Sequence, residues 1–320
     1  MLEKILAAIE AHDIIIIHRH VRPDPDALGS QMGLKAVLEE TYPHKDIYAV
    51  GQDDDSLAEF GDMDDISDDT YKNALVIVND SANRPRIDDQ RYKKGATLVK
   101  VDHHPNEDPY GDFMIVEPSI SSTSELWASI ILRDDNNLQM NDEAAKCFFL
   151  GIVGDTGRFL YDNTTRDTMQ IAGELLNYDF PASELMQESN TQTISQARLQ
   201  AYVLQNMKLS AQGTVNSVYI SQDLLQSLDL TANETYQIVQ IPGTIEGVIT
   251  WVTFIEQPDG KVRCRIRSKG PVINHIAAQH DGGGHEKASG ANVYSSEEKD
   301  ELLAQLGEVA MKYRRDHFYD

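Results

Sequence analysis

The segment IIIIHRHVRPDPDALGS, residues 14–30, places a run of isoleucines directly before a polar stretch. The apolar run is typical of a strand buried on both faces, as in a parallel sheet. The polar stretch contributes His20, Asp24 and Asp26, which are all metal-ligand residue types. Taken alone, this spacing is equally compatible with a helix N-cap followed by a solvated turn. The surrounding sequence therefore decides whether a site lies here.

Apolar runs and amphipathic stretches alternate through the first half of the chain. Strands are expected at residues 14–18, 47–50, 74–79 and 98–101. Helices are expected between these strands, and later at about residues 122–133, 142–153 and 165–177. This alternation favours an α/β fold with a mostly parallel sheet and flanking helices.

The sequence becomes polar and helix-prone near residue 188, and alternating strand patterns follow beyond residue 210. We therefore expect a first domain at residues 1–187, a linker helix at 188–210 and a smaller α/β domain at 211–320.

The charge balance is strongly acidic, with 52 Asp and Glu against 28 Lys and Arg and a formal net charge of -24. Such a surface repels long nucleic acids, so binding of a long duplex is not expected. A small anionic substrate at a local cationic site remains compatible with this charge.

The expected location is the cytoplasm. No apolar stretch reaches the roughly 20 residues that cross a bilayer, so no membrane contact is expected. The start, MLEKILAAIEAHD, favours an amphipathic helix over a signal peptide. Cys147 and Cys264 lie in apolar contexts that are typical of buried thiols.

Further acidic and imidazole side chains also follow apolar segments. They are Asp80, the triplet Asp102, His103 and His104, and Asp155. In an open parallel sheet, the carboxyl ends of neighbouring strands face one crevice, where ligands bind. We therefore expect these side chains to meet those of residues 20–26 at one edge of the sheet.

A cluster of carboxylates is unstable unless cations compensate it. Two carboxylates about 4 Å apart repel by roughly 4 kcal/mol at an effective dielectric constant of ~20. Two divalent cations would neutralise the four aspartates of this cluster. Carboxylate and imidazole ligands without thiolate suit manganese, with magnesium, cobalt or iron as alternatives, and exclude a cysteine-type zinc site. Two ions that share a carboxylate form the arrangement of two-metal hydrolases.

Five motifs occur in a characteristic order: HVRPDPDA, ND at residues 79–80, DHH at residues 102–104, GDTGRF and GGGHEKASG. Together they resemble the DHH phosphoesterases with a DHHA1 domain, in particular the short two-domain type that acts as an oligoribonuclease and a 3′,5′-bisphosphate (pAp) phosphatase. The resemblance covers nearly the whole chain. It implies that the first domain is the catalytic metal-binding domain and that the second binds substrate.

The resemblance implies two manganese ions per active site, held by six residues: His20 and Asp24 for one ion, Asp26, His103 and Asp155 for the other, and Asp80 between them. His104 is implied to orient or protonate the phosphate and its leaving oxygen, which makes it catalytic together with Asp80 and Asp155. Asp102 is implied to fix the tautomer of an imidazole, with a strand-end cap as the alternative role.

A second site is expected downstream. The strand pattern at residues 262–267 places Arg263, Arg265 and Arg267 on one face, which favours an anion site over a solvated face paired with acids. Glycines 282–284 allow backbone N–H groups to approach a phosphate closely. By resemblance, the far phosphate and nucleotide of a short substrate are held by five residues: Arg267, Ser268, Gly283, Gly284 and His285. Asp281 stands where relatives often have a further glycine.

The expected function is metal-activated hydrolysis of short oligoribonucleotides (nanoRNA) to mononucleotides, with dephosphorylation of pAp to AMP as a second activity. A phosphodiesterase for cyclic or linear dinucleotides, such as c-di-AMP or pApA, is the nearest alternative. A RecJ-type DNA exonuclease is disfavoured by the acidic charge, and an inorganic pyrophosphatase by the GGGH motif. A non-catalytic nucleotide sensor is disfavoured because all six ligand residues are present. A homodimer is compatible with the sequence.

Overall fold

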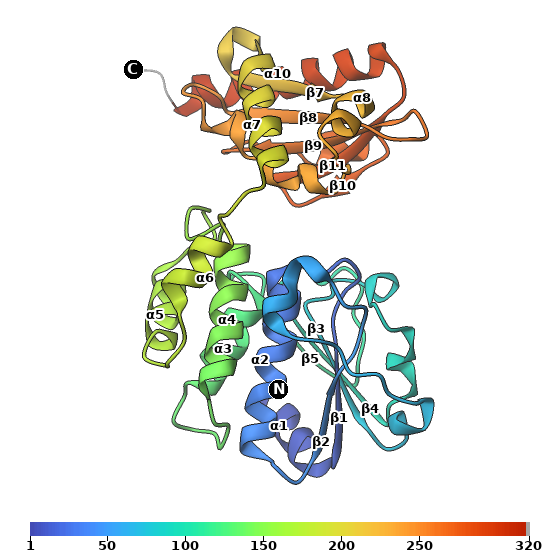
Figure 1. Ribbon diagram of the computed structural model, residues 1–320, viewed down its shortest axis with the longest axis vertical. Coiled ribbons are helices and arrows are strands. Elements are labelled where there is room, and N and C mark those ends of the chain that lie inside the picture. Colours follow the sequence, from blue (N-terminus) through green and yellow to red (C-terminus); the bar gives the residue numbers. More distant parts are fainter. Residues whose placement is uncertain (318–320) are drawn as a thin grey trace. The chain divides into compact units, whose positions relative to one another are not determined.

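A computed structural model describes residues 1–317 of the chain, which divides into two compact units after Asn190. Each unit contains one sheet covered by helices (Figure 1). The last three residues of the predicted second domain, 318–320, lie outside the described residues.

The sheet of the first unit has five parallel strands in the order β2-β1-β3-β4-β5. The strands are β1 (Ile14–His18), β2 (Asp46–Ala49), β3 (Leu75–Asn79), β4 (Thr97–Asp102) and β5 (Phe113–Val116). The isoleucines of β1 at positions 15, 16 and 17 are fully buried, as their apolar character predicts for an inner parallel strand. The predicted parallel α/β fold is therefore confirmed.

Helices enclose this sheet on one face. They are α1 (Leu2–Ala11), α2 (Pro25–Thr41), α3 (Thr123–Ile131), α4 (Asp142–Asp155), α5 (Arg166–Leu175) and α6 (Ala182–Glu188). The main apolar core lies between these helices and the sheet, with Trp127 and Phe148 fully buried in it. The other face is covered by loops and short 3-10 turns: η1 (Asp55–Phe60), η2 (Asp68–Tyr71), η3 (Arg84–Arg86) and η4 (Gln90–Lys94).

Glycines allow α2 and α4 to pack closely together. A Cβ on Gly29 of α2 would come within 2.6 Å of the carbonyl oxygen of Cys147 in α4. A Cβ on Gly151 of α4 would overlap the hydroxyl of Ser124 at the start of α3. The backbones of α2 and α4 therefore lie close together, and the start of α3 packs against α4 through the side chain of Ser124.

The second unit contains a mixed six-stranded sheet in the order β10-β11-β9-β8-β7-β6. Its strands are β6 (Lys208–Ser210), β7 (Val215–Ile220), β8 (Thr250–Glu256), β9 (Val262–Ser268), β10 (Gly283–Gly284) and β11 (Ala288–Val293). Only β7 and β8 pair in parallel among the described strands of this sheet.

In the second unit, helices cover both faces of the sheet. They are α7 (Ile194–Asn206), α8 (Gln222–Ser227), α9 (Asn274–Ala278) and α10 (Ser296–His317), with the 3-10 turns η5 (Ala211–Gly213), η6 (Glu234–Ile238) and η7 (Ile241–Thr244). Leu302 and Leu306 of α10 are buried against one face. Leu199 and Val203 of α7 are buried against the other, so α7 belongs to the core of this unit.

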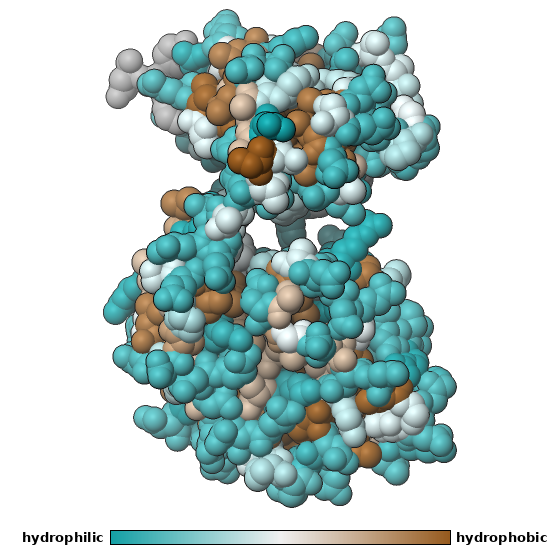
Figure 2. All heavy atoms as spheres, viewed as in Figure 1, coloured by the Kyte–Doolittle hydropathy of each residue, from teal (hydrophilic) through white to brown (hydrophobic). Residues whose placement is uncertain are grey.

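The visible surface is mostly hydrophilic, as the large excess of acidic residues leads one to expect (Figure 2). Within residues 1–317, the helices are too short or too polar for any of them to traverse a lipid bilayer.

Candidate metal centre and active site

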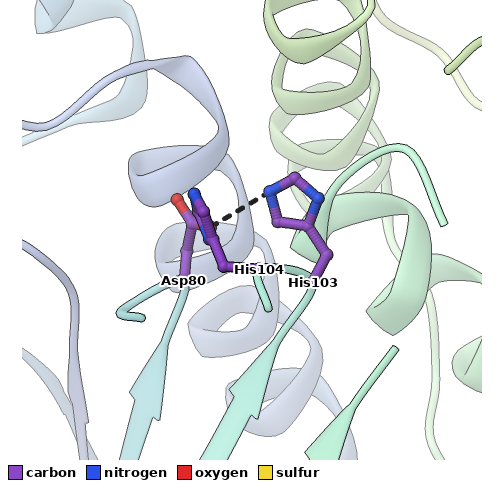
Figure 3. Close-up of side chains that lie close together, drawn as sticks. All are labelled: Asp80, His103 and His104. Atoms are coloured by element: carbon purple, nitrogen blue, oxygen red, sulfur yellow. Dashed lines mark ion pairs between the residues drawn. The ribbon is translucent and has the colours of Figure 1, made fainter. Parts of the chain in front are cut away.

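The candidate metal-binding side chains gather at the carboxyl edge of the parallel sheet. His20 lies just beyond the end of β1, Asp80 directly follows β3, and His103 directly follows β4. Because these strands are neighbours in the sheet, their ends bring the three side chains together. Figure 3 shows Asp80, His103 and His104 at the ends of adjacent strands.

Two helices bring the remaining carboxylates to the same edge. Asp24 is the N-cap of α2, where its Oδ1 accepts a hydrogen bond from the Ala27 N–H at 3.0 Å, and Asp26 lies in the first turn. Asp155 is the last residue of α4. The carboxylate of Asp155 therefore comes from a helix end rather than from a strand end.

The first donor group consists of His20, Asp24 and Asp80. The Nε2 atom of His20 lies 3.6 Å from Asp24 Oδ2 and 3.3 Å from Asp80 Oδ2. The other ring nitrogen, Nδ1, faces the carbonyl oxygen of Val21 at 2.9 Å. Donation from Nδ1 to this carbonyl leaves the Nε2 lone pair directed at the two carboxylates, as a metal ligand requires.

The second donor group consists of Asp26, His103 and Asp155. The Nε2 atom of His103 lies 3.1 Å from Asp155 Oδ2 and 3.9 Å from Asp26 Oδ2. This nitrogen is buried and has no hydrogen-bond partner among the described residues. A buried ring nitrogen facing carboxylate oxygens fits a site for a cation.

Asp80 lies between the two groups. Its Oδ2 faces His20, whereas its Oδ1 lies 3.5 Å from His103 Nε2. The backbone of Asp80 has a φ of 50°, a left-handed conformation that aspartate tolerates better than most residues. The N–H of Asp80 donates to the carbonyl of Val101 at 3.0 Å, which fixes this turn against β4. The carboxylate is thus held where its two oxygens reach different donor groups.

The start of α3 holds Asp26 in place. The backbone N–H groups of Thr123 and Ser124 each donate to one oxygen of Asp26, both at 2.8 Å. The Thr123 hydroxyl also donates to Asp80 Oδ1 at 3.2 Å. The positive end of the α3 dipole favours a carboxylate at this position. The sequence indicated a helix start in this segment, but no pattern showed which carboxylate it would face.

His104 is oriented by Asp102. Its Nδ1 lies 2.9 Å from Asp102 Oδ1 and 3.3 Å from Asp80 Oδ1, and its backbone N–H donates to Asp102 Oδ1 at 3.1 Å. Asp102 is fully buried and lies 3.3 Å from the ammonium group of Lys100, which is also fully buried. The ring of His104 packs against that of His103 with 4.5 Å between centroids.

The pKa values of the histidines reflect the carboxylates around them. Burial alone would lower the pKa of His20, but hydrogen bonds and charges of its aspartate neighbours raise it to about 10. At His103 the carboxylate of Asp155, 3.1 Å away, outweighs burial and raises the pKa to about 9, and the balance seen at His20 raises the pKa of His104 to about 11. Each ring position is thus strongly favourable for a cation, either a proton on the ring or a metal ion in its place.

The aspartates show the complementary effect. Burial raises the pKa of Asp26 well above its usual value, and the charges of Asp80 and Asp155 raise it further. Burial also acts to raise the pKa of Asp80, but hydrogen bonds with His104 and His20 hold it well below its usual value. The histidines of the cluster therefore do not fully neutralise the negative charge of its aspartates. This excess of negative charge fits the two-cation site expected from the sequence.

The predicted substrate-binding residues of the second unit lie on neighbouring strands. Arg267 and Ser268 end β9, Gly283 and Gly284 form β10, and His285 follows. The strand β11 lies between β9 and β10 and pairs with both. These residues therefore lie within three neighbouring strands of one sheet. The side chain of Ser268 is buried on the face opposite to that of Arg267, and its hydroxyl accepts a hydrogen bond from the Gly270 N–H at 3.1 Å.

The arginine-bearing face of β9 has no acidic partner among the described residues. Cys264 and Ile266 are buried in the core, whereas Arg263, Arg265 and Arg267 lie on the opposite face. Within residues 1–317, no carboxylate lies within ion-pair distance of these three arginines. Pairing with acids, the alternative considered for this face, is therefore not observed.

The glycine-rich loop is tightly built. Gly284 has a φ of 133°, and a Cβ there would come within 2.8 Å of the Ala288 carbonyl oxygen. Asp281 adopts a φ of 49° and accepts a hydrogen bond from the Tyr294 hydroxyl at 2.8 Å. The carboxylate of Asp281 therefore already has a hydrogen-bond partner within the second unit.

Comparison with known proteins decides the family. The description "DHH family, N-terminal domain" matches residues 14–152, and "DHHA1 domain" matches residues 212–312. A Bacillus subtilis protein named bifunctional oligoribonuclease and PAP phosphatase NrnA is 48% identical over 307 residues, which cover 96% of this chain and 97% of that protein. This chain belongs to the DHH family.

Further relatives of this DHH chain have the same extent. A Streptococcus mutans protein named probable bifunctional oligoribonuclease and PAP phosphatase NrnA is 49% identical over 302 residues, covering 94% of this chain and 96% of that protein. The crystal structure of an exopolyphosphatase-related protein from Bacteroides fragilis has a TM-score of 0.82 and 27% identity, covering 98% of this chain and 96% of that one. DHH phosphoesterases depend on metal ions, and three overlapping donor groups fit such ions: the two described above and a third formed by Asp80, His103 and His104.

Proposed function

We propose that this protein is a two-metal phosphoesterase that degrades oligoribonucleotides of a few residues to mononucleotides and dephosphorylates pAp to AMP. The observation that carries the proposal is that the two oxygens of Asp80 face His20 and His103, which belong to two different donor groups, in a DHH-DHHA1 chain. Near-full-length relatives at 48% and 49% identity are named for both activities.

The proposed metal ligands divide between two ions. His20, Asp24 and Asp80 would hold one, and Asp26, His103, Asp155 and the second oxygen of Asp80 would hold the other. We propose manganese, because mixed imidazole and carboxylate ligation without thiolate suits it, with magnesium or cobalt as substitutes. When bound, the ions would activate water and stabilise charge on the phosphoryl oxygens.

The protein's own groups would supply orientation and a proton. Hydrogen bonds from Thr123 and Ser124 keep the Asp26 carboxylate fixed, so the spacing of the donor groups is set before substrate arrives. Asp102 holds His104 in its protonated form, and His104 would then donate its proton to the oxygen that leaves phosphorus. Asp102 would act through His104 and not on the substrate.

We also propose that Arg267, Ser268, Gly283, Gly284 and His285 bind the part of the substrate that is not hydrolysed. Guanidinium and backbone N–H groups suit phosphate, and no carboxylate in the described part of the chain pairs with Arg267. The net charge of -24 supports short substrates over long ones, because a long polynucleotide would gain little from counterion release on such a surface.

Product analysis tests the proposal. The purified protein in manganese is incubated with pAp, pApA, c-di-AMP and a labelled RNA length ladder, and products are separated by chromatography. The proposal expects AMP from pAp and mononucleotides from the short RNAs, with rates that fall as RNA length increases. Turnover of c-di-AMP or pApA alone would instead assign a dinucleotide phosphodiesterase, and binding without turnover would assign a sensor.

A further inference from the structure

Arg86 lies beside the first donor group and has no acidic partner within residues 1–317. Its side chain is exposed, and its Nη2 atom is 3.3 Å from Nδ1 of His20. Arg84, on the same 3-10 turn, is paired and lies 2.6 Å from Asp108. In a chain with 52 acidic and 28 basic residues, an unpaired arginine at a site rich in carboxylates requires an explanation.

The backbone around Arg86 is fixed against the loop that carries His20. The carbonyl of Arg86 accepts a hydrogen bond from the Val21 N–H at 2.7 Å. The next residue, Ile87, is almost fully buried and forms a bridge with His20. The guanidinium therefore extends from an anchored segment and not from a free loop, so its approach to the donor group is built into the fold.

The ring of His20 cannot accept a hydrogen bond from Arg86 once its Nε2 atom binds a metal ion. When Nε2 of His20 serves as a metal ligand, the ring proton must be on Nδ1, where the Val21 carbonyl accepts it at 2.9 Å. An Nδ1–H group cannot accept a hydrogen bond from Arg86. When the metal is bound, no residue within 1–317 therefore accepts a hydrogen bond from the Arg86 guanidinium, which lies one imidazole ring away from the proposed metal position.

We propose that Arg86 binds a substrate phosphate other than the one that is hydrolysed, which makes it a specificity-determining residue of the first unit. This inference rests on the proposed function. The guanidinium faces the Nδ1 edge of His20, whereas the reacting phosphate would lie toward Nε2. A substrate with a second phosphate, such as the 5′-phosphate of pAp, can therefore place one phosphate at each edge. A planar guanidinium binds phosphate through paired hydrogen bonds, which an exposed lysine does not reproduce.

The test compares two substrates that share the reacting 3′-phosphate. pAp carries the additional 5′-phosphate, and 3′-AMP does not. In Arg86→Ala, kcat/KM for pAp should fall about ten- to a hundredfold through KM, as expected for loss of a charge-assisted contact. The value for 3′-AMP should stay within about threefold of wild type, because no such contact is lost. Arg86→Lys should recover only part of the loss.

Arg84→Ala is the matched control, because Arg84 is exposed, lies on the same 3-10 turn and is paired with Asp108. It should leave both substrates near wild type. Equal losses on pAp and 3′-AMP in Arg86→Ala would overturn the inference by assigning Arg86 to the reacting phosphate or the metal site. An unchanged preference for pAp would overturn it as well. A wild-type protein inactive on both substrates would instead refute the proposed function itself, and the inference with it.

Discussion

Replacing Asp80 by asparagine should disable both metal positions at once, because its two oxygens face different histidines. Oδ2 lies 3.3 Å from His20 Nε2, and Oδ1 lies 3.5 Å from His103 Nε2. Asparagine keeps the shape of the side chain and removes its charge. If the ions contribute about 4 kcal/mol to transition-state stabilisation, their loss lowers the rate about a thousandfold. We therefore expect a loss of this size on pAp, dinucleotides and bis-p-nitrophenyl phosphate alike.

Metal analysis and kinetics on the same samples decide this prediction. After dialysis against manganese, Asp80→Asn should retain almost no metal, whereas Asp155→Asn should retain the ion of the His20 group. Asp108→Asn, which alters a partly buried carboxylate that is paired with Arg84 outside the donor groups, is the control and should behave like wild type. Thermal unfolding establishes that each variant is folded. The reasoning is refuted if Asp80→Asn keeps more than about a tenth of the wild-type rate, a loss of only about 1.4 kcal/mol. Equal metal loss in Asp80→Asn and Asp155→Asn would refute the shared position of Asp80.

Other predictions follow from the same geometry. His104→Ala should keep its metal and mainly lose kcat, whereas His103→Ala should lose metal; the opposite result in elemental analysis would exchange the two roles. Arg267→Ala and His285→Ala should raise KM for dinucleotides and pAp about ten- to a hundredfold and spare bis-p-nitrophenyl phosphate; equal losses on both substrate types would contradict a separate substrate contact. EDTA should inactivate the enzyme, and manganese should restore activity better than zinc. Because the pKa of His20 is raised to about 10, manganese must displace its proton, so affinity should rise as pH increases from about 6 to about 9. Calorimetry in buffers of different ionisation enthalpy should detect this proton release, and equal heats in all buffers would contradict it.

The position of the site at the sheet edge could be predicted because it follows from local sequence patterns. The apolar run at residues 14–17 becomes an inner parallel strand, and the polar residues after it lie at its carboxyl end. The same rule places Asp80 and His103 nearby, because β1, β3 and β4 are neighbours. The alternation of β9 likewise predicted a cationic face, since side chains of a strand point to opposite sides in turn.

Contacts between distant segments could not be predicted in this way. Asp26 is held by Thr123 and Ser124, nearly a hundred positions away, through the packing of α2 against α3. Asp155 reaches the site from the end of α4, and this also depends on helix packing. The edge strand β5, Phe113–Val116, is not among the expected strands, and all four of its residues are only partly buried. The position of Arg86 beside His20 likewise depends on a bridge between two loops.

The close packing of α2, α3 and α4 constrains how this enzyme can vary during evolution. Gly29 and Gly151 carry no functional group, yet a methyl group at either position would push neighbouring backbone or side-chain atoms apart. At Gly151 the affected neighbours include Ser124, whose N–H holds Asp26. A substitution at Gly151 would therefore change the distance between the Asp26 carboxylate and the neighbouring carboxylates without replacing any of these residues. The spacing of the carboxylates in the active site thus depends partly on Gly29 and Gly151, which have no reactive side chain.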